Sequence, residues 1–292
     1  MEKGQRITIE DAFKIVRQID RDIYKHIPIG RNNFVFLSKN KCISIPKDQE
    51  KIRYDIRAAA MRYLQEHSIP TTELLSHGIH EGIEYIITKK IDAQNIDVTS
   101  LSLAEQINVH EQCALVAHKL HELKTNGYGR LNQGLTGPYT KWSEFVIDFF
   151  ESVMKRLYTT DILRDKFSRL LNEKFSAMSY LLEDQQIAFL HGDYHIGNIL
   201  FKKGELKALI DLDIVMNGDI YWDLGHYVRT FKGDRSKGLD AFSHAYGEWN
   251  IDKANYYAMI IWTRKLASQG ESRPEAFNET IPEMERILKW SI

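Results

Sequence analysis

The chain contains few cysteines, few prolines and no long apolar run, and each scarcity excludes a class of protein. Cys42 and Cys113 are its only cysteines, too few for a disulfide scaffold or a cysteine zinc site and typical of a reducing cytoplasm. Six prolines and 17 glycines are too few for a collagen-like or linker-dominated chain. No apolar stretch approaches the roughly 18 residues that a membrane helix needs. Since residues 1–6 also lack the apolar core of a signal peptide, we expect a cytoplasmic protein without membrane contact.

The chain also has almost no net charge. Its formal charge at pH 7 is -1, so no overall basic field predicts nucleic acid as a partner. Residues 1–90 carry an excess of Lys and Arg, whereas residues 91–292 carry an excess of Asp and Glu. Chance explains such an asymmetry as well as function does. The functional interpretation is a phosphate-binding part beside a part that receives cations.

The chain does have aromatic and aliphatic residues in ample number for a core, and their spacing changes along it. In residues 1–90, the β-rich segments 34–37 and 42–45 flank a polar turn and predict a hairpin. Apolar residues at helical spacing predict a helix over 49–67, just before Pro70. A second hairpin is predicted over 74–88. The first third is therefore expected to consist of strands around one helix.

Beyond residue 90 the pattern is mainly helical. Gly-rich residues 127–138 predict a loop of a length that is often functional. The change from strands to helices predicts two parts, 1–90 and 91–292. Helices are expected over 103–123, 141–158 and 161–182 and beyond 222, with short strands at 187–190, 199–201 and 206–210.

The most informative segment is residues 189–200, Phe-Leu-His-Gly-Asp-Tyr-His-Ile-Gly-Asn-Ile-Leu. A strand ends there and a polar loop presents Asp193, followed by Asn198. A hairpin then leads to Asp211 and Asp213. Phosphoryl transfer needs a carboxylate that orients the attacking hydroxyl, and an amide oxygen and a second carboxylate that bind Mg²⁺. Asp-x-x-x-x-Asn followed by an Asp at a strand end is the spacing that kinases use for these tasks.

His-Gly-Asp-x-x-x-x-Asn followed by Ile-Asp-x-Asp resembles the aminoglycoside phosphotransferase and choline kinase family, whose members share the protein-kinase fold and act on small molecules. Residues 218–224, Gly-Asp-Ile-Tyr-Trp-Asp-Leu, are similar to a second motif of that family. Residues 127–131 and 137–142 are similar to the segment after its first large-lobe helix. The resemblance covers nearly the whole chain, and the His-Gly-Asp motif is its most specific part.

The resemblance implies a role for each matching residue. Asp193 would be the catalytic base, or the group that orients the substrate hydroxyl. Asn198 and Asp211 would be Mg²⁺ ligands, and Asp213 would lie near the second metal or support it. Two further residues would be structural: His191 would brace the loop, and Asp223 would bond its backbone or His191.

The resemblance also implies where the nucleotide binds. Lys89 and Lys90 fall at the hinge between the lobes, where backbone groups would contact adenine. The loop over the phosphates would contain Gly30, Arg31 and Asn32. Gly30 is a single glycine without the Gly-x-Gly pattern of such loops, so this second assignment rests on position alone.

The sequence departs from the family pattern in one place. The family has a lysine on its third strand, paired with a glutamate of the following helix, and the lysine holds the nucleotide phosphates. Here Ser44 occupies the lysine position and Arg57 the glutamate position. One hypothesis is that Arg57 reaches the phosphates, because an arginine fork suits phosphate oxygens. The alternative is that Arg57 is a solvated helix residue and nucleotide binding is weak.

The acceptor is the least determined feature. Glu144, Asp148 and Glu151 fall on one face of the helix over 141–158 and would suit a cationic acceptor, although such a row is equally typical of a solvated helix surface. An aminoglycoside or another amino-bearing antibiotic is the first expectation, and antibiotic resistance would follow from it. Choline, another amino alcohol, a sugar and homoserine stay open, since function depends on the site rather than on the fold.

The sequence thus predicts an α+β protein of the protein-kinase-like two-lobe type, with a strand-rich small lobe and a helical large lobe. It predicts a Mg²⁺-dependent transfer of the γ-phosphoryl group of ATP, with GTP as a possible donor, to a hydroxyl group of a small molecule. A kinase-like module that binds nucleotide with little catalysis is the alternative from another class. The oligomeric state is not indicated.

Overall fold

The computed structural model describes residues 7–22, 24–28, 32–48, 53–159, 166–183 and 186–272. Contacts divide the chain into two compact units. The first unit comprises Met1–Asp97, Leu131–Leu135 and Gly197–Val215, and the second comprises Val98–Arg130, Thr136–Ile196 and Met216–Ile292. The segment 197–215 therefore belongs with the N-terminal residues, although the sequence separates it from them by about a hundred positions.

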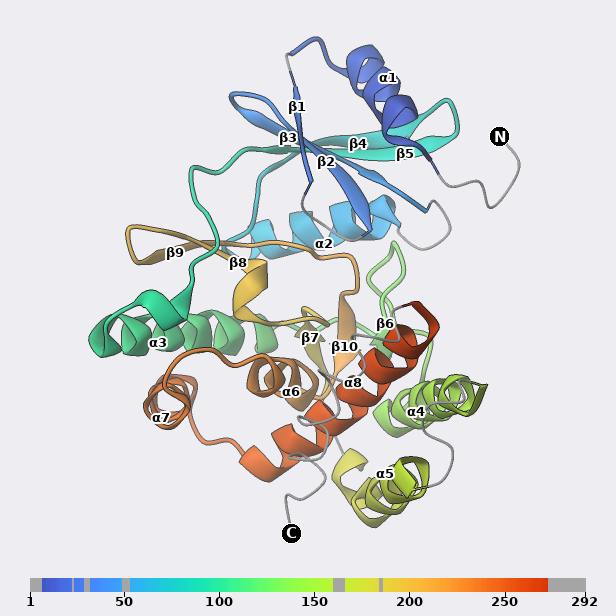
Figure 1. Cartoon of the computed structure of the whole chain (residues 1–292), viewed down its shortest axis with the longest axis vertical. Helices are drawn as coiled ribbons and strands as arrows, with labels where there is room; N and C mark the ends of the chain where they lie inside the picture. Colours follow the sequence, from blue (N-terminus) through green and yellow to red (C-terminus); the bar gives the residue numbers. More distant parts are fainter. Residues whose placement is uncertain are drawn as a thin grey trace. The chain divides into compact units, whose positions relative to one another are not determined.

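The first unit is built on an antiparallel sheet (Figure 1). The turn between the second and third strands gives the expected first hairpin, with Phe36 opposite Ile43. The second hairpin is also confirmed, with His80 opposite Ile83. In spatial order the strands are β1 (Lys25–Ile27), β2 (Asn33–Leu37), β3 (Lys41–Pro46), β5 (Ile83–Lys89) and β4 (Leu74–His80).

Two helices cover opposite faces of this sheet, α1 (Ile9–Ile19) and α2 (Tyr54–Glu66) (Figure 1). Side chains of a strand alternate between its faces. Ile43 and Ile45 of β3 accordingly pack into the core beneath α1, which leaves Ser44 on the other face. The predicted helix over 49–67 is confirmed from Tyr54 to Glu66, and residues 49–52 lie outside the described residues.

The sequence analysis missed α1, and the expectation of one helix in the first third was wrong. Thr8 caps the helix by accepting a hydrogen bond from the backbone N–H of Asp11. Ala12, Ile15 and Val16 are buried on one face. The cap and the helical spacing were both present in the sequence, so the signal existed.

A separate two-stranded hairpin completes the first unit. Its strands are β8 (Ile199–Lys202) and β9 (Glu205–Leu209). The hairpin is joined to the rest of the unit by backbone bridges from Gln94 to Phe201 and from Thr71 to Leu209. These bridges explain why it belongs with the sheet of the first unit.

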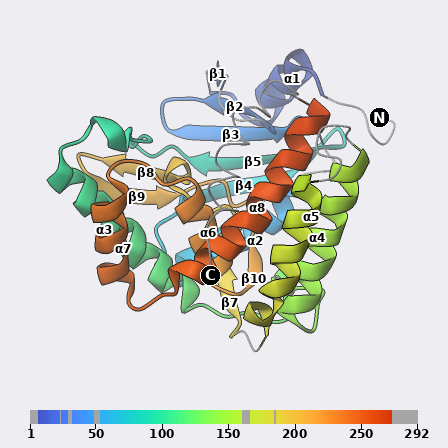
Figure 2. The same cartoon turned by 60° about the horizontal axis from the view of Figure 1, so that its bottom comes forward.

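The second unit is mainly helical, as the sequence predicts, and includes a small sheet in the order β6-β10-β7. Figure 2 shows α4, α5 and α8 next to one another. A capping box of Ser102 and Glu105 starts its first long helix. The helices are α3 (Leu103–His121), α4 (Trp142–Thr159), α5 (Lys166–Ala177), α6 (Tyr221–Arg229), α7 (Arg235–Tyr246) and α8 (Ile251–Ser272), and the strands are β6 (Gly129–Arg130), β7 (Ala188–Leu190) and β10 (Met216–Gly218).

Aromatic side chains form the core of the second unit. The ring of Trp142 lies edge-on to that of Trp222, with centroids 5.7 Å apart, and both side chains are buried. The indole N–H of Trp142 donates to the hydroxyl of Tyr257 at 2.7 Å, so its one polar group is satisfied inside the core. Among the described residues, no helix is long and apolar enough to cross a membrane.

Gly218 of β10 fits against this core only because it has no side chain. A Cβ atom at this position would overlap the indole ring of Trp142. We expect Gly218→Ala to lower the free energy of unfolding by about 1–3 kcal/mol, the usual cost of overpacking, as measured by urea denaturation. Gly134→Ala is the control, because its Cβ would lie 3.3 Å from the amide oxygen of Asn132 and would overlap no ring or backbone atom; equal losses in both variants would contradict the explanation.

Candidate active site

A buried carboxylate fixes the loop that follows β7 in the second unit. Asp223 of α6 accepts hydrogen bonds from the backbone N–H groups of His191, at 2.8 Å, and Gly192, at 2.9 Å. His121 of α3 lies 3.3 Å from the same carboxylate. Gly192 has a φ of 81°, a conformation that glycine adopts without strain. The loop is thus held at the two residues that precede Asp193.

The charge of Asp223 is stabilised in spite of its burial. Burial raises the pKa of Asp223, but the hydrogen bond and the charge of His121 outweigh that effect, so the pKa lies below its ordinary value. The side chains of His191 and Asp223 are both fully buried. The sequence predicted structural roles for these two residues. Both side chains lie in the interior, and Asp223 accepts hydrogen bonds from the loop to which His191 belongs.

Asp193 itself is partly exposed and is contacted by two histidines. His226 Nδ1 lies 2.9 Å from its Oδ1, and His195 Nε2 lies 3.6 Å from its Oδ2. Burial raises the pKa of Asp193, but the hydrogen bonds from His195 and His226 outweigh it and bring the pKa well below its ordinary value. Asp193 is therefore ionised over the physiological range and can accept a hydrogen bond from a hydroxyl group.

His226 is a site residue that the sequence analysis missed. Burial lowers its pKa to about 4, so the ring is neutral and its Nδ1–H donates to Asp193. Its Nε2 is buried without a hydrogen-bond partner among the described residues. His226 follows Asp193 by 33 positions, and only the placement of α6 brings the two together. Its one sequence signal was its place two residues beyond the second family-like motif, 218–224.

The first unit contains the two residues expected to bind metal. Asn198 comes immediately before β8, and Asp211 follows β9 by two residues. The backbone N–H of Ile210 donates to the carbonyl of Asn198 at 2.9 Å, so the two ends of the hairpin are adjacent. Asn198 is buried, whereas Asp211 is exposed and has a φ of 64°.

The donor pair of Asn198 and Asp211 suits Mg²⁺ better than it suits a metal that is held entirely by protein ligands. Both side chains offer hard oxygen donors. The described residues contain no group of three or more His, Cys, Asp or Glu that could hold a metal. Mg²⁺ commonly takes one or two protein ligands and completes its shell with water and substrate phosphates. A nucleotide-borne Mg²⁺ is thus the metal that the donor set suits.

Asp213 is already engaged on both carboxylate oxygens. Its Oδ1 lies 3.2 Å from a terminal nitrogen of Arg57, and its Oδ2 accepts from the side-chain amide of Asn33 at 3.2 Å. The hydroxyl of Tyr54 in turn donates to the oxygen of that amide at 3.0 Å. The network joins α2, β2 and the segment after β9 within the first unit.

Arg57 is a partner of Asp213 rather than a solvated residue, so the alternative of a solvated side chain was wrong. Only 13% of its side chain is exposed. Burial lowers the pKa of Arg57, but the charge of Asp213 more than reverses that effect and raises it above its ordinary value. Its Nε is buried without a partner among the described residues. Ser44, at the expected lysine position, is buried and interacts with the Tyr54 hydroxyl.

At the expected hinge, the two backbone N–H groups are already used. Lys89 donates its N–H to the carbonyl of Glu73, and Lys90 donates to the carbonyl of Asn40, both at 2.8 Å. Any adenine contact by these residues must therefore use their carbonyls. In the expected phosphate loop, Gly30 and Arg31 lie outside the described residues, and the carbonyl of Asn32 accepts from the N–H of Lys47 at 2.8 Å.

The three candidate acceptor residues lie on the exposed face of α4. Glu144 accepts from the hydroxyl of Thr140, at 3.0 Å, and from the backbone N–H of Lys141, at 3.1 Å. Asp148 accepts from the hydroxyl of Tyr139 at 3.1 Å. Glu151 is also exposed. Two of the three thus have local partners, as on a solvated helix surface.

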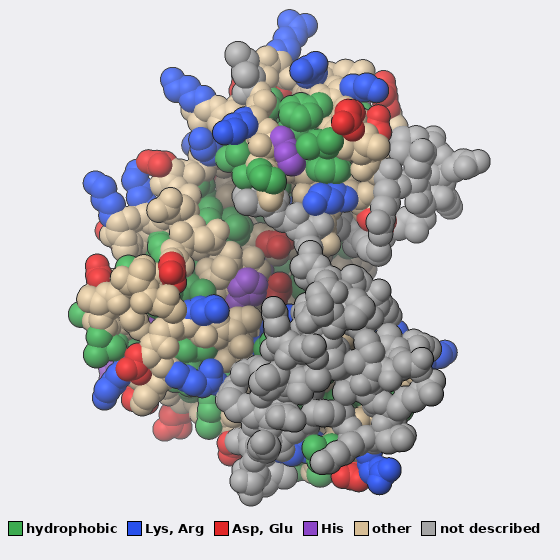
Figure 3. Space-filling model, viewed as in Figure 1, with side chains coloured by type: hydrophobic (Ala, Val, Ile, Leu, Met, Phe, Trp, Pro, Cys, Tyr) green, Lys and Arg blue, Asp and Glu red, His purple; other side chains and the backbone are tan. Residues whose placement is uncertain are grey.

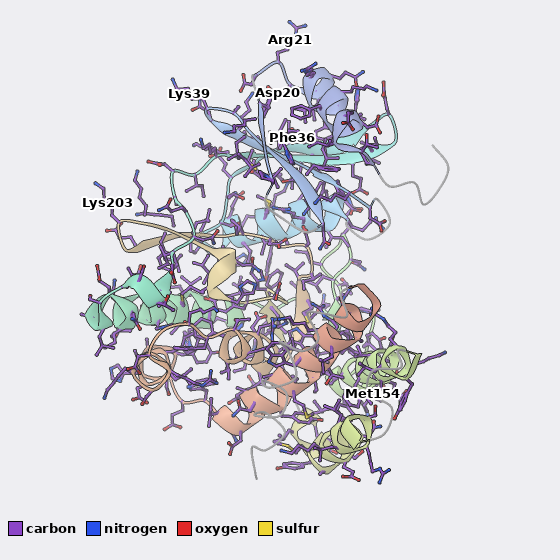
Figure 4. The ribbon with its side chains drawn as sticks, viewed as in Figure 1. Asp20, Arg21, Phe36, Lys39, Met154 and Lys203 are labelled. Carbon is purple, nitrogen blue, oxygen red and sulfur yellow. The ribbon has the colours of Figure 1, made fainter. Side chains whose placement is uncertain are left out.

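The first unit also has an open cleft of about 630 Å³ lined by lysines. Lys39 projects from the turn between β2 and β3, and Lys203 projects from the tip of the β8–β9 hairpin (Figure 4). Figure 3, in the same view, shows blue side chains gathered over these tips. Lys202 is paired with Asp92 at 2.6 Å. The lining also includes the buried ring of Phe201 and the half-buried side chains of Ile91 and Ile96.

The sequence of this chain matches the profile of a known protein family. The profile of the phosphotransferase enzyme family matches residues 42–259, most of the chain. The chain belongs to the phosphotransferase enzyme family. The resemblance predicted from the His-Gly-Asp motif is therefore confirmed.

Curated relatives of the family are distant. Hygromycin-B 4-O-kinase of Escherichia coli is 23% identical over 175 residues, 56% of this chain and 50% of that protein. Stress response kinase A of Escherichia coli strain K12 is 23% identical over 172 residues, 59% of this chain and 48% of that protein. The chain thus spans about half the length of the curated relatives it matches.

Solved structures of similar proteins establish the fold. A ternary complex of aminoglycoside phosphotransferase APH(4)-Ia with AMP-PNP and hygromycin B has a TM-score of 0.74 at 17% identity, covering 95% of this chain and 97% of that chain. A choline/ethanolamine kinase family protein from Mesorhizobium loti has a TM-score of 0.71 at 17% identity, covering 92% and 88%. The predicted protein-kinase-like α+β fold is confirmed.

Replacing the carboxylate of Asp223 tests the loop anchor of this phosphotransferase-family chain. An asparagine side chain at this position would offer one oxygen to two N–H donors and would turn its own NH₂ toward them. We expect Asp223→Asn to lower the free energy of unfolding at pH 7 by about 3–5 kcal/mol, measured by urea denaturation, and Asp148→Asn on the exposed face of α4 to have little effect.

The effect of Asp223→Asn should depend on pH. Because the folded-state pKa of Asp223 is lowered, its charge stabilises the fold above the unfolded pKa of about 3.9. That contribution declines as the pH falls from this value toward the folded pKa. The stability difference between the two proteins should therefore shrink below about pH 4; a difference that stays constant would contradict a role of the charge.

Proposed function

We propose that this protein is a Mg²⁺-dependent phosphotransferase that moves the γ-phosphoryl group of ATP to a hydroxyl group of a small molecule. The observation that carries the proposal is Asp193, an ionised and partly exposed carboxylate, in a loop held by Asp223. The Asn198 and Asp211 oxygens of the same sequence motif supply the two metal ligands. The family profile and the AMP-PNP complex of a similar structure support nucleotide as the donor.

Each residue has a limited task in this reaction. Asp193 accepts a hydrogen bond from the attacking hydroxyl, orients it and takes its proton as the new P–O bond forms. The bond between the γ-phosphorus and the β,γ-bridging oxygen breaks in the same step, and ADP leaves with that oxygen. His226 keeps Asp193 ionised and in place through its 2.9 Å contact. Mg²⁺, when bound, neutralises charge on the β- and γ-phosphates, and Asn198 and Asp211 fix its position. Positioning and charge neutralisation provide most of the catalysis in phosphoryl transfer.

On the nucleotide side, we place the adenine contact at the expected hinge of the first unit. The N–H groups of Lys89 and Lys90 are used within the unit. We therefore assign adenine recognition to the carbonyl of Lys89 and the N–H of Ile91. Gly30, Arg31 and Asn32 remain the proposed phosphate loop. The proposal treats ATP as the donor and GTP as the alternative.

The Arg57–Asp213 pair takes the place of the missing lysine–glutamate pair. In the family pattern a cation on the sheet is held by an anion on the helix. Here the helix α2 provides the cation, and the segment just after Asp211 provides the anion. The pair links α2 to the metal-binding segment, and we assign Arg57 a positioning role through Asp213 together with the electrostatic attraction of its charge for phosphate. Ser44 leaves room for this side chain.

The alternative function, a module that binds nucleotide with little catalysis, is favoured by the absent lysine–glutamate pair. Against it stand the retained base and both metal ligands, which a binding module does not need. The similarity to a hygromycin-B kinase supports a small hydroxyl-bearing acceptor. This similarity does not determine the charge of the acceptor. The expectation of an aminoglycoside, and of antibiotic resistance with it, came from the excess of acidic residues in 91–292 and stays a prediction.

Two variants separate binding from catalysis. Asp211→Asn should weaken Mg²⁺-dependent binding of AMP-PNP in a calorimetric titration, because one metal ligand loses its charge. Asp193→Asn should bind the nucleotide with unchanged affinity but release ADP at least about 100-fold more slowly, the usual contribution of a positioned base. If the wild-type protein binds no nucleotide with Mg²⁺, neither with ATP nor with GTP, the kinase proposal is wrong.

The role of Arg57 can be tested on the same helix. Arg57→Ala should weaken AMP-PNP binding about tenfold or more, because a charge-assisted contact is lost and Asp213 is left unpaired. Arg62→Ala, on the exposed side of α2, is the matched control. Combining Arg57→Ala with Asp213→Ala should add little to the single losses, since both remove the same contact. Unchanged affinity and ADP release in Arg57→Ala would refute the assignment.

A further inference from the structure

The charges near Asp193 in the second unit are mostly positive. Arg229, two turns after Asp223 on α6, brings a terminal nitrogen to 3.9 Å from Asp193 Oδ1 and 3.4 Å from His226 Nδ1. Arg264 of α8 is close enough to act on both His226 and Arg229, lowering the pKa of each. These two guanidinium groups were not found by the sequence analysis.

Arg229 is buried with incomplete compensation. Only 10% of its side chain is exposed, and its guanidinium lies over the ring of Trp262 at 5.1 Å. Burial lowers its pKa to about 10, with Asp193 acting in the opposite direction. Its Nε is buried without a hydrogen-bond partner among the described residues, and so is the indole Nε1 of Trp262. Two N–H donors in one place thus have no acceptor.

The guanidinium of Arg264 is also largely buried, and its charge is also incompletely compensated. Burial lowers its pKa, and the charge of Arg156 lowers it further, while Asp193 raises it. Within the described residues no ion pair joins Arg264 to a carboxylate. Asp193, which already receives the contacts of two histidines, is therefore the acidic group that acts on both arginines.

Other carboxylates of the second unit are used elsewhere. Asp223 binds the loop before Asp193. Asp219 is buried, accepts from the hydroxyl of Tyr257 at 2.8 Å and pairs with Lys253 at 2.7 Å. Two under-compensated guanidinium groups beside one carboxylate leave a net positive charge. A buried charge without a partner is costly, and an entering anion would remove that cost, whereas a polycation would be repelled.

We propose that the acceptor carries an oxyanion, a carboxylate or a phosphate, near the hydroxyl that receives the phosphoryl group, that Arg229 binds this oxyanion, and that the charge of Arg264 adds to the attraction. The inference rests on the proposed function, because it places the acceptor hydroxyl at Asp193. A guanidinium fork suits either oxyanion by two parallel hydrogen bonds. The Nε of Arg229 and the Nε1 of Trp262 are buried N–H donors that lack an acceptor among the described residues. A hydroxy acid or a sugar phosphate belongs to this substrate class, and an aminoglycoside does not.

Three small probes of one carbon skeleton test the charge requirement. Glycerol, glycerate and glycerol 3-phosphate all carry hydroxyl groups, but the first is neutral, the second has a carboxylate and the third a phosphate. Each is titrated by calorimetry into the full chain saturated with Mg²⁺ and AMP-PNP, so that the nucleotide site is filled. We expect at least one anionic probe to bind and glycerol not to bind. The preferred anion then identifies the source of the oxyanion.

Variants identify the residues responsible. Arg229→Met and Arg264→Met should each weaken binding of the preferred anion about tenfold or more, and Arg264→Lys, which keeps the charge, should lose less. Lys237→Met, on the exposed surface of α7, is the charge-matched control and should bind as the wild type does. Thermal unfolding and AMP-PNP affinity show whether each variant remains folded. If Arg229→Met does not fold, the comparison of Arg264→Met with Arg264→Lys tests the inference instead.

Two outcomes would overturn the inference. One is that neither anionic probe binds more tightly than glycerol. The other is that the arginine variants bind the anion as the wild type does, which would mean that Arg229 and Arg264 serve only the fold. Failure of the proposed function is a separate result. In that case the protein does not bind AMP-PNP in the presence of Mg²⁺. In that case the anion titrations are repeated without nucleotide and still test the arginines.

Discussion

The buried carboxylate of Asp223 is the interaction on which the candidate site depends. It satisfies two consecutive backbone N–H groups, those of His191 and Gly192, and so fixes the chain just before Asp193. The same helix continues with His226 and Arg229, at intervals of three residues, which places all three on one side of α6. One helix therefore anchors the loop, keeps its aspartate ionised and adds a positive charge beside it.

On our proposal, the Arg57–Asp213 pair replaces the ion pair of the family pattern with different residues. The sequence lacks the lysine and the glutamate of the family pattern. The structure has a pair of opposite polarity in the first unit, with the cation on α2 and the anion next to Asp211. Asn33 and Tyr54 extend the contact into the sheet and the helix, so the network connects both to the segment that contains Asp211, the proposed metal ligand.

On our proposal, the local charge beside Asp193 and not the overall charge of the second unit selects the acceptor. Residues 91–292 carry an excess of acidic residues, which favoured a cationic acceptor. Many of those residues are exposed, as are Glu144, Asp148 and Glu151, and water screens exposed charges. Arg229 is largely buried, where screening is weak. On our proposal, the few desolvated charges beside Asp193 determine which acceptor is attracted.

The sequence by itself determined the family and the fold class, and it singled out the residues of the candidate catalytic motif. Short-range spacing carries that information: Asp193 and Asn198 lie in one loop, and a hairpin of fixed length leads to Asp211. It also predicted most strands and helices, because apolar periodicity is a local property, although α1 was overlooked. The tertiary structure alone decided the partners of Asp193 and Arg57. His226, Arg229 and Arg264 come from α6 and α8, and Asp213 lies 156 positions from Arg57, so these contacts depend on how helices pack and not on any spacing along the chain.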